Sequence, residues 1–342
     1  MIKGLFEAAN RCYTWEHVLT AAEFRGDAAE LKQDLAVALA VQAYADEQGF
    51  EVSAADVESA ADEFRLEHEL IAGEDLEQWL DHCGLALDDF EAFFVRRLLA
   101  DRFRDQADDI GRDYAPAAAD VASHMWAELI LTGGYEALSV ALARRVAVRL
   151  DGSASSAPAE VHKSRREAAV LLDGKTLDPE WLTELAEMET AYEAAERAAL
   201  MSEHRDREIR ARFIQLTRIE IAEAAFPSFD QAREAYQCVI GEGESLESVA
   251  TRSRAAFDVA TRFYDDVPDE VRDLFFSAPA GKVFPPQKGD EPFAVREIRR
   301  RIEPEPDDPE VSARVRERLL ANRFDAMVSQ HVRWLFDPWN RT

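Results

Sequence analysis

Apolar positions in the first part of the chain recur at spacings of three and four, which is the period of amphipathic helices. Residues 28–48 show it most clearly, and Gly49 directly after them is suited to end a helix in the left-handed conformation. Ser53 is a favourable N-cap residue for a second helix at 54 to about 71. A third helix is expected at 86 to about 104. Helix therefore follows helix for more than half of the chain, and we expect a multi-helix body.

The period changes after residue 209. The expected order of elements becomes strand, helix, helix, strand, helix, strand, strand, which predicts one small α+β domain. These elements are expected, in that order, at 213–221, 229–241, 246–252, 256–264 and within 268–298. A cluster of prolines then precedes a final helix at about 311–335. The apolar face of this helix needs more surface than the small domain offers, so we expect the helix to pack on the helical body.

Two stretches of the body echo each other. Residues 72–80 and 173–182 each carry a glycine, a leucine three positions later and a Trp-Leu pair, so Trp79 corresponds to Trp181. A linker of small residues at 151–158 separates them. Each tryptophan is expected to belong to the core, with contact to a ligand as the alternative. We predict a mostly α, α+β chain with four segments: helical module 1 at 1–150, helical module 2 as its partial repeat at 151–211, the small domain at 212–302, and the C-terminal helix at 303–342.

The charge balance limits the classes of partner. The chain has 342 residues, and 40 basic against 68 acidic side chains give a net charge of −28. A nucleic-acid binder needs a basic face, so nucleic acid is excluded as a partner. The same negative field repels anionic membranes and attracts basic peptides. No apolar run reaches the roughly 18 residues of a spanning helix, and the first residues lack a signal-peptide pattern, so we expect a cytoplasmic protein.

Motifs for metal, cofactor or covalent chemistry are absent from the sequence. Three widely spaced cysteines, Cys12, Cys83 and Cys238, form neither a disulfide framework nor a Cys-x-x-Cys pair. There is no His-Glu-x-x-His, no Gly-rich phosphate loop and no Gly-x-Ser-x-Gly turn. Asp81 and His82 precede Cys83, but adjacent helical residues point apart. We therefore expect no metal and no cofactor, and a structural role for the cysteines.

One stretch carries a family resemblance. Residues 268–298, PDEVRDLFFSAPAGKVFPPQKGDEPFAVREI, resemble the last third of a parvulin-type peptidyl-prolyl isomerase. The matching positions are Phe275, Phe276, Gly281, Pro286, Phe293 and Val295. The helical part resembles the helical lobe of SurA-like chaperones. Residues 73–103 are similar to a sub-family of cytosolic parvulin-like proteins that serve the maturation of ribosomally made, modified peptides. The resemblance implies a precursor or client peptide as partner, and it adds a maturation enzyme as a second candidate partner.

Departures from the parvulin pattern fall where catalysis is expected. Ala294 stands where the last parvulin strand carries a histidine, and no histidine lies between Arg205 and Gln330. Val271 and Ala278 replace larger apolar residues of the proline pocket. We therefore expect weak or no prolyl isomerase activity in the usual assay. The residues that the resemblance makes candidates for peptide contact are Val271, Phe276 and Phe293 as apolar wall, Arg218, Glu220, Asp258 and Arg262 as polar groups, and Trp79 and Trp181 in the body.

Two functions remain open at this point. One is a chaperone-like peptide-binding protein with a degenerate parvulin domain, assisting maturation of a ribosomally made precursor peptide. The alternative is an active enzyme, either a prolyl isomerase or a peptide-modifying enzyme that reuses the fold. Buried charged groups in a pocket would favour the enzyme. A long apolar groove without them would favour the chaperone.

Overall fold

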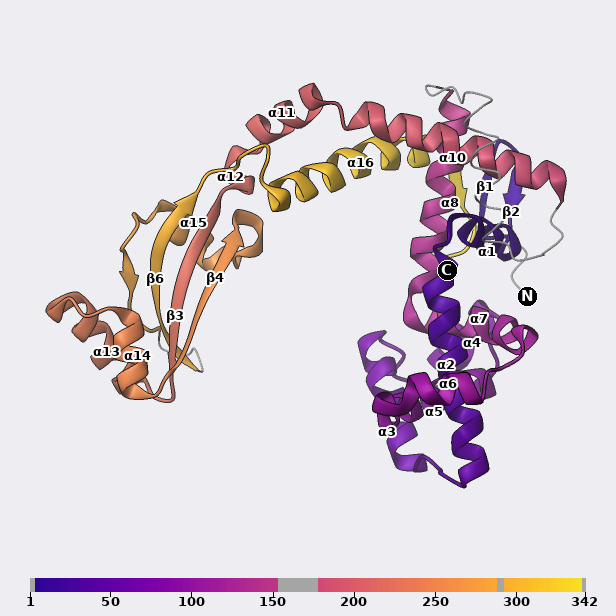
Figure 1. Ribbon diagram of the computed structural model, residues 1–342, viewed down its shortest axis with the longest axis horizontal. Helices are drawn as coiled ribbons and strands as arrows, with labels where there is room; N and C mark the ends of the chain where they lie inside the picture. The colour runs from indigo at the N-terminus through magenta and orange to yellow at the C-terminus, as the bar shows by residue number, and fades with distance from the viewer. Residues whose placement is uncertain (1–3, 153–177, 288–291, 340–342) are drawn as a thin grey trace. The chain divides into compact units, whose positions relative to one another are not determined.

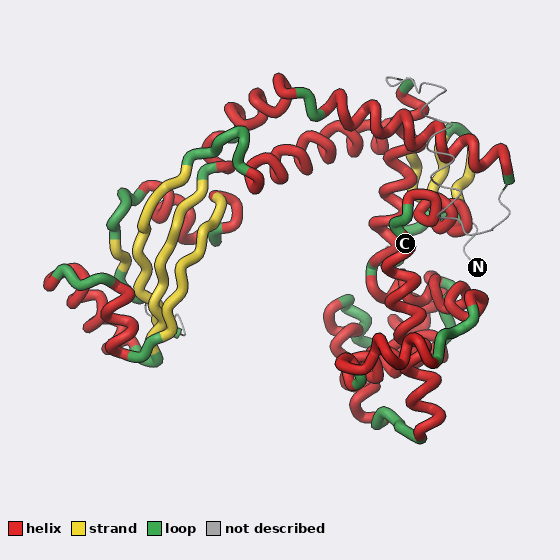
Figure 2. The backbone as a smooth tube through the Cα atoms, viewed as in Figure 1, coloured by secondary structure: helices red, strands yellow, loops and turns green. Residues whose placement is uncertain are grey.

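The computed structural model describes residues 4–152, 178–287 and 292–339. The chain divides into two compact units, one of Met1–Ala198 with Asn322–Thr342 and one of Ala199–Ala321. Figures 1 and 2 show the elements of each. The fold is the mostly helical α+β arrangement that the sequence predicts. Most of the predicted linker at 151–158 lies outside the described residues, as do residues 159–177 of the predicted second helical module.

The first unit is built mainly from helices. The expected helix at 28–48 is present with those limits, and Gly49 ends it at φ 70°. Ser53 accepts a hydrogen bond from the Asp56 backbone N–H, so it caps the next helix as predicted. The helices are α1 Trp15–Arg25, α2 Ala28–Gln48, α3 Ala54–Glu67, α4 Gly73–Cys83, α5 Leu87–Arg102, α6 Ala107–Asp113, α7 Ala118–Thr132, α8 Gly134–Asp151 and α10 Pro179–Ala199, with a short 3-10 turn η1 at Arg104–Gln106.

A small sheet in this unit corrects two expectations. Strands β1 (Phe6–Ala8), β2 (Arg11–Tyr13) and β7 (Val332–Trp334) form an antiparallel sheet in the order β2-β1-β7. The expectation that the first part of the chain is helical throughout is therefore wrong at its start, because three-residue strands are too short to show an alternating pattern. The final helix ends at His331 instead of 335, because the next residues pair with β1.

The second unit holds a four-stranded antiparallel sheet in the order β4-β3-β6-β5. The expected first strand at 213–221 is wrong at both limits, because it starts later and ends at Phe226. Residues 213–216 form a helical turn in which the Thr217 hydroxyl donates to the Phe213 carbonyl, and the strand starts at Arg218. The elements are α11 Ser202–Ala211, α12 Phe213–Leu216, β3 Arg218–Phe226, α13 Phe229–Glu242, α14 Leu246–Ser253, β4 Ala256–Phe263, η2 Tyr264–Asp266, α15 Asp269–Ser277, β5 Val283–Phe284, β6 Phe293–Ile302 and the first part of α16 Pro309–His331.

Alternation along β3 gives the two faces of this sheet different neighbours. Ala222, Ala224 and Phe226 pack with the buried residues of α13 and α14. Ile219 and Ile221 point to the other face, where they pack with residues of α15 and β5. Two separate apolar cores therefore sandwich the sheet, and the second of them leaves part of its face open.

Helix α16 has residues in both units. In the second unit, its first turns bury Val311 and Val315 against an apolar cluster that includes Phe263. From Asn322 onward the chain belongs to the first unit. There Phe324 stacks on Tyr192 with ring centroids 4.5 Å apart. None of the helices in the described part of the chain has the length and apolar character needed to cross a membrane.

Candidate functional site

The second unit contains a cleft of about 650 Å³ on the sheet face opposite α13 and α14. Strands β3, β4 and β6 form its floor, and the segment from η2 into α15 forms one wall. Its lining residues are Ile221, Glu223, Asp258, Ala260, Arg262, Asp266, Val267, Pro268, Val271, Phe275, Gln287 and Arg296. The cleft is therefore part apolar and part charged.

The charged floor follows from strand register. Glu223 on β3 lies opposite Asp258 on β4 and opposite Arg296 on β6. Residues directly opposite each other in an antiparallel sheet share a face, so the three side chains lie in one row. Arg296 Nε donates to Glu223 Oε2 at 2.5 Å. Asp258 is exposed beside this ion pair, so the row presents a surplus negative charge to the cleft.

The apolar side of the cleft is fixed by α15. Val267 is buried, Val271 is half-buried, and the Phe275 ring lies 5.0 Å from the Phe284 ring, centroid to centroid. Asp266 at the start of this wall is paired with Arg314. The wall is thus anchored by apolar packing and by an ion pair to α16, and it offers hydrocarbon surface next to carboxylates.

Three of the sequence-predicted residues meet in this cleft: Asp258, Arg262 and Val271. Asp258 and Arg262 are both exposed, and they lie on the same face of β4 because they are four residues apart. Val271 faces them from α15. The sequence therefore indicated one strand and one wall of the site.

The other candidates in this unit lie elsewhere. Phe276 packs edge-on against Tyr264 with centroids 4.7 Å apart, and Phe293 packs against the α13 and α14 core on the opposite face. Arg218 is buried and forms ion pairs with two carboxylates ahead of and within α16. Glu220 accepts a hydrogen bond from Arg300 at 2.9 Å. None of these four lines the cleft.

Glu223 and Arg296 are the site residues that sequence reasoning missed. They are 73 positions apart, and neither belongs to a recognisable motif. The available signal was an opposite charge on the predicted last strand, Arg296, and two residues beyond the predicted end of the first strand, Glu223. That signal becomes specific only when the register between the strands is known.

The two tryptophans of the helical body lie in core positions. Trp79 has no exposed surface, and the rings of Phe64 and Phe90 lie against it. Trp181 is 9% exposed, with the Arg11 guanidinium 4.8 Å from its ring centroid. This placement favours the core role over direct ligand contact for both.

Cys83 is a buried cysteine whose thiol is less acidic than usual. Its side chain is fully buried, and burial raises the pKa of the thiol to about 12. The thiolate that would bind metal or attack an electrophile is therefore scarce at neutral pH. The neighbouring His82 points to a different partner, the backbone carbonyl of Asp337 at 2.7 Å.

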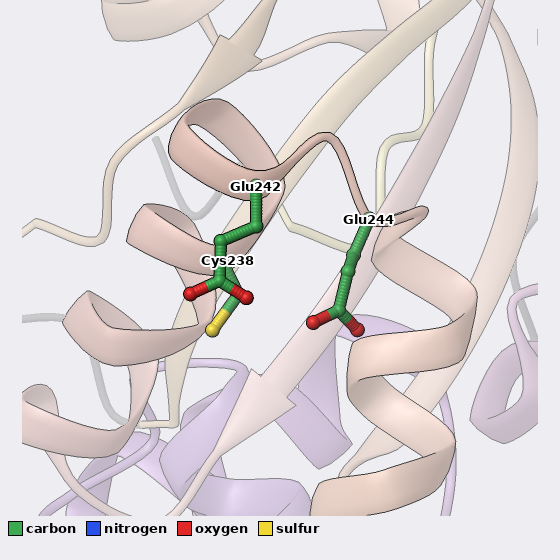
Figure 3. A group of neighbouring side chains, drawn as sticks. All are labelled: Cys238, Glu242 and Glu244. Atoms are coloured by element: carbon green, nitrogen blue, oxygen red, sulfur yellow. The ribbon is translucent and has the colours of Figure 1, made fainter.

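One group among the described residues has the spacing of metal ligands. The ligand atoms of Cys238, Glu242 and Glu244, at the end of α13, lie within 4.8 Å of one another (Figure 3). The Glu244 carboxylate already accepts hydrogen bonds of 2.9 and 2.6 Å from Arg252 Nη1. A cation would have to displace this guanidinium, so the group gives no independent support to a metal site. The absence of a metal stays a prediction.

Comparison with known proteins gives likeness of fold only. No family model and no curated protein matches the sequence. Among solved structures, the peptidylprolyl isomerase PrsA from Bacillus cereus is 12% identical and has a TM-score of 0.32, with 64% of this chain and 86% of that chain covered. PrsA from Bacillus anthracis is 10% identical with a TM-score of 0.28, and 55% and 92% are covered.

A structure from Campylobacter jejuni is also similar. It comes from work on PEB4 and Cj1289, two SurA-like chaperones, and it is 10% identical with a TM-score of 0.19. The match covers 65% of this chain and 96% of that chain. At these identities and TM-scores, the similarity does not assign an activity. Function must therefore be argued from the cleft itself.

Proposed function

We propose that this protein is a chaperone-like factor that binds an extended segment of a client peptide in the cleft of the second unit. The observation that carries the proposal is a part charged, part apolar cleft whose floor ends in the edge strand β4. In the described part of the sheet, β4 pairs with β3 on one side and has no strand on the other. An extended peptide can add to such an edge through backbone hydrogen bonds, while pockets select its side chains.

Asp258 and the net charge of the chain favour a basic residue in that peptide, next to Asp258 and away from Arg262. Asp258 offers a carboxylate without an ion-pair partner among the described residues, and the net charge of −28 draws cations toward the molecule. Val271 and Phe275 supply apolar contact on the facing wall. A segment that alternates basic and apolar side chains would place the two kinds on opposite faces of a strand. Added to β4, such a segment can turn its basic face to the cleft side of the sheet, next to Asp258.

The finer identity of the client forms part of the same proposal. The resemblance of residues 73–103 supports a ribosomally made precursor peptide as client, handled in the cytoplasm beside a partner maturation enzyme. The exposure of Asp258 and Arg262 supports binding over acid–base chemistry, since catalytic acids and bases are tuned by burial.

Peptide binding is expected to depend on salt and on Asp258. A fluorescent decapeptide that alternates arginine and valine should bind more weakly as salt rises from about 0.05 to 0.5 M, because screening removes the long-range attraction. Asp258→Asn should weaken binding about two- to five-fold, in line with one exposed ion pair. Fluorescence anisotropy titration measures both effects.

Asp230→Asn is the matched control for charge. Asp230 is exposed on α13, on the opposite face of the sheet, so its loss removes the same charge without touching the cleft. It should leave binding within a factor of about two. Equal weakening by both variants would show that only net charge matters and would remove the cleft from the proposal. Lack of binding at any salt concentration would contradict the chaperone role.

Prolyl isomerase activity is expected to be weak. In a protease-coupled assay on a short proline peptide, kcat/KM should fall below about 10⁴ M⁻¹s⁻¹, the low end of typical enzymes. Ala294 is 3% exposed and carries no group that could hydrogen-bond a twisted amide, and Val271 gives a small apolar wall. An efficient isomerase serves as positive control. A value within the ordinary enzyme range would favour the alternative function, an active isomerase.

A further inference from the structure

The helical body contains a second cavity that the proposed function does not use. It has a volume of about 610 Å³ and lies among α2, α3, α5 and α7. Phe64, Phe93 and Leu131 are its buried apolar lining residues. Trp339 lines it as well and stacks on His68 with ring centroids 4.0 Å apart. The cavity thus has aromatic walls within a single compact unit.

Arg96 brings an incompletely paired positive charge into this cavity. It lies on α5, it lines the cavity, and it is only 2% exposed. Its Nε is buried and has no hydrogen-bond partner. Its Nη2 reaches Glu128 Oε2 at 3.4 Å, which is long for a charge-assisted hydrogen bond. Burial of a guanidinium costs free energy unless its N–H groups make hydrogen bonds. A further hydrogen-bond acceptor beside Arg96 would therefore be stabilising.

Glu128 does not supply all of that acceptor capacity. It is half-buried on α7, and burial raises the pKa of its carboxyl even though the Arg96 charge acts to lower it. The other charged residues that line the cavity, Asp34, Glu67 and Arg97, are exposed. Arg96 is therefore the buried cationic group of the cavity, and it lies next to apolar rings.

We propose that this cavity binds an aromatic or aliphatic carboxylate, with the carboxylate held by Arg96 and the hydrocarbon part lying between Phe64 and Phe93. The planar guanidinium matches a carboxylate through two parallel N–H···O bonds. A dianionic phosphate would require more donors than one arginine supplies beside Glu128. The carboxylate belongs either to the C-terminus of a peptide or to a free small acid. This site lies in a different unit from the cleft, and it selects the opposite charge.

The salt dependence of this site should also be opposite to that of the cleft. The net charge of −28 repels an anion at long range, and salt screens that repulsion. The contact with buried Arg96 is screened far less. Affinity for the carboxylate should therefore stay constant or rise with salt, while binding of the basic peptide to the cleft falls. This difference separates the two sites in the full chain.

Isothermal titration of the full chain with N-acetyl-phenylalanine and with its amide tests the proposal. The acid should bind with a Kd of about 1 mM or below, and the amide at least about ten-fold more weakly, a difference of about 1.4 kcal/mol. Equal binding of acid and amide, or no binding of the acid at about 10 mM, would overturn the proposal. A peptide with a free C-terminal phenylalanine and its amidated form complete the comparison. Tighter binding of the peptide acid than of N-acetyl-phenylalanine assigns the ligand to a peptide terminus, and the reverse assigns it to a small acid.

Two variants locate the binding. Arg96→Met should abolish the preference for acid over amide, whereas Arg97→Met, which removes an exposed arginine from the same cavity, should change it less than about two-fold. Ala100→Phe fills the cavity from α5 and leaves Arg96 in place, so it should weaken binding of the acid at least about ten-fold even if Arg96→Met fails to fold. A melting curve for each variant establishes that it is folded. An unchanged acid preference in folded Arg96→Met would contradict the assignment to Arg96.

Discussion

Replacement of Trp79 by alanine is expected to lower the free energy of unfolding of the helical body by about 3–5 kcal/mol. The indole has no exposed surface and packs among aromatic rings of α3 and α5, with Trp339 stacked on it at 5.4 Å between centroids. Alanine would leave a cavity that these rigid rings cannot fill. Chemical denaturation followed by circular dichroism measures the loss as a shift of the transition of the helical body.

Trp79→Phe is the matched control. The Trp79 indole N–H is buried and has no hydrogen-bond partner, so phenylalanine sacrifices no hydrogen bond and keeps most of the apolar contact. Its cost should be about 1–2 kcal/mol. A stability of Trp79→Ala within about 1 kcal/mol of the unaltered protein would mean that this cluster does not hold the body together.

Arg218→Ala is expected to cost the second unit about 2–4 kcal/mol. The Arg218 guanidinium is buried, pairs with Asp308 and Glu310, and lies 5.3 Å from the ring centroid of Phe263. Asp308 also caps α16, where its Oδ1 accepts from the Glu310 backbone N–H at 2.9 Å. Loss of the cation leaves two carboxylates side by side at the start of that helix. Equilibrium unfolding in urea measures the change.

The same contact gives a pH dependence. Burial acts to raise the pKa of Asp308, but hydrogen bonds from backbone N–H groups and the Arg218 charge outweigh it, so the pKa lies below its ordinary value of 3.8. A lowered carboxyl pKa contributes stability above the unfolded-state value, and this contribution is lost as pH falls through the folded-state value. Arg218→Ala should therefore show a smaller loss of stability on acidification below about pH 4.

Arg262→Ala is the control that shows what removal of an exposed arginine does to the stability of the second unit. Arg262 is exposed on β4, and its replacement should cost less than about 0.5 kcal/mol. Similar costs at the two positions would contradict a structural role for the Arg218 cluster.

The sequence predicted those helix ends that depend on a single capping residue. Gly49 and Ser53 marked helix ends correctly, because capping depends on the residue at that one position. The three-stranded sheet escaped prediction, because its strands are three residues long and β1 pairs with β7 from the far end of the chain. The start of β3 was placed too early, because Phe213 and Ile214 suggest strand but lie exposed in a helical turn.

The candidate site could be predicted only in part, because some of its residues are marked by local pattern and others only by strand register. Asp258 and Val271 belong to the cleft and were indicated by their positions on a predicted strand and helix. Phe293 lies directly opposite Phe226 in the strand pairing, so both side chains point to the sheet face that α13 and α14 cover. Register is set by long-range packing, so no single stretch of sequence shows which face a strand residue takes.

The pairing of β1 with β7 favours an order of folding. Arg333 pairs with Glu7 across 326 positions, and the whole second unit is synthesised between them. Contacts so distant in sequence form late, because closing the loop between them costs entropy before the contacts stabilise it. The second unit lies in one uninterrupted stretch of chain and can fold as it emerges from the ribosome, whereas the first unit is complete only when its last strand has been made. During that interval the outer edge of β1 stays open, and nascent protein is then most exposed to aberrant pairing with other chains.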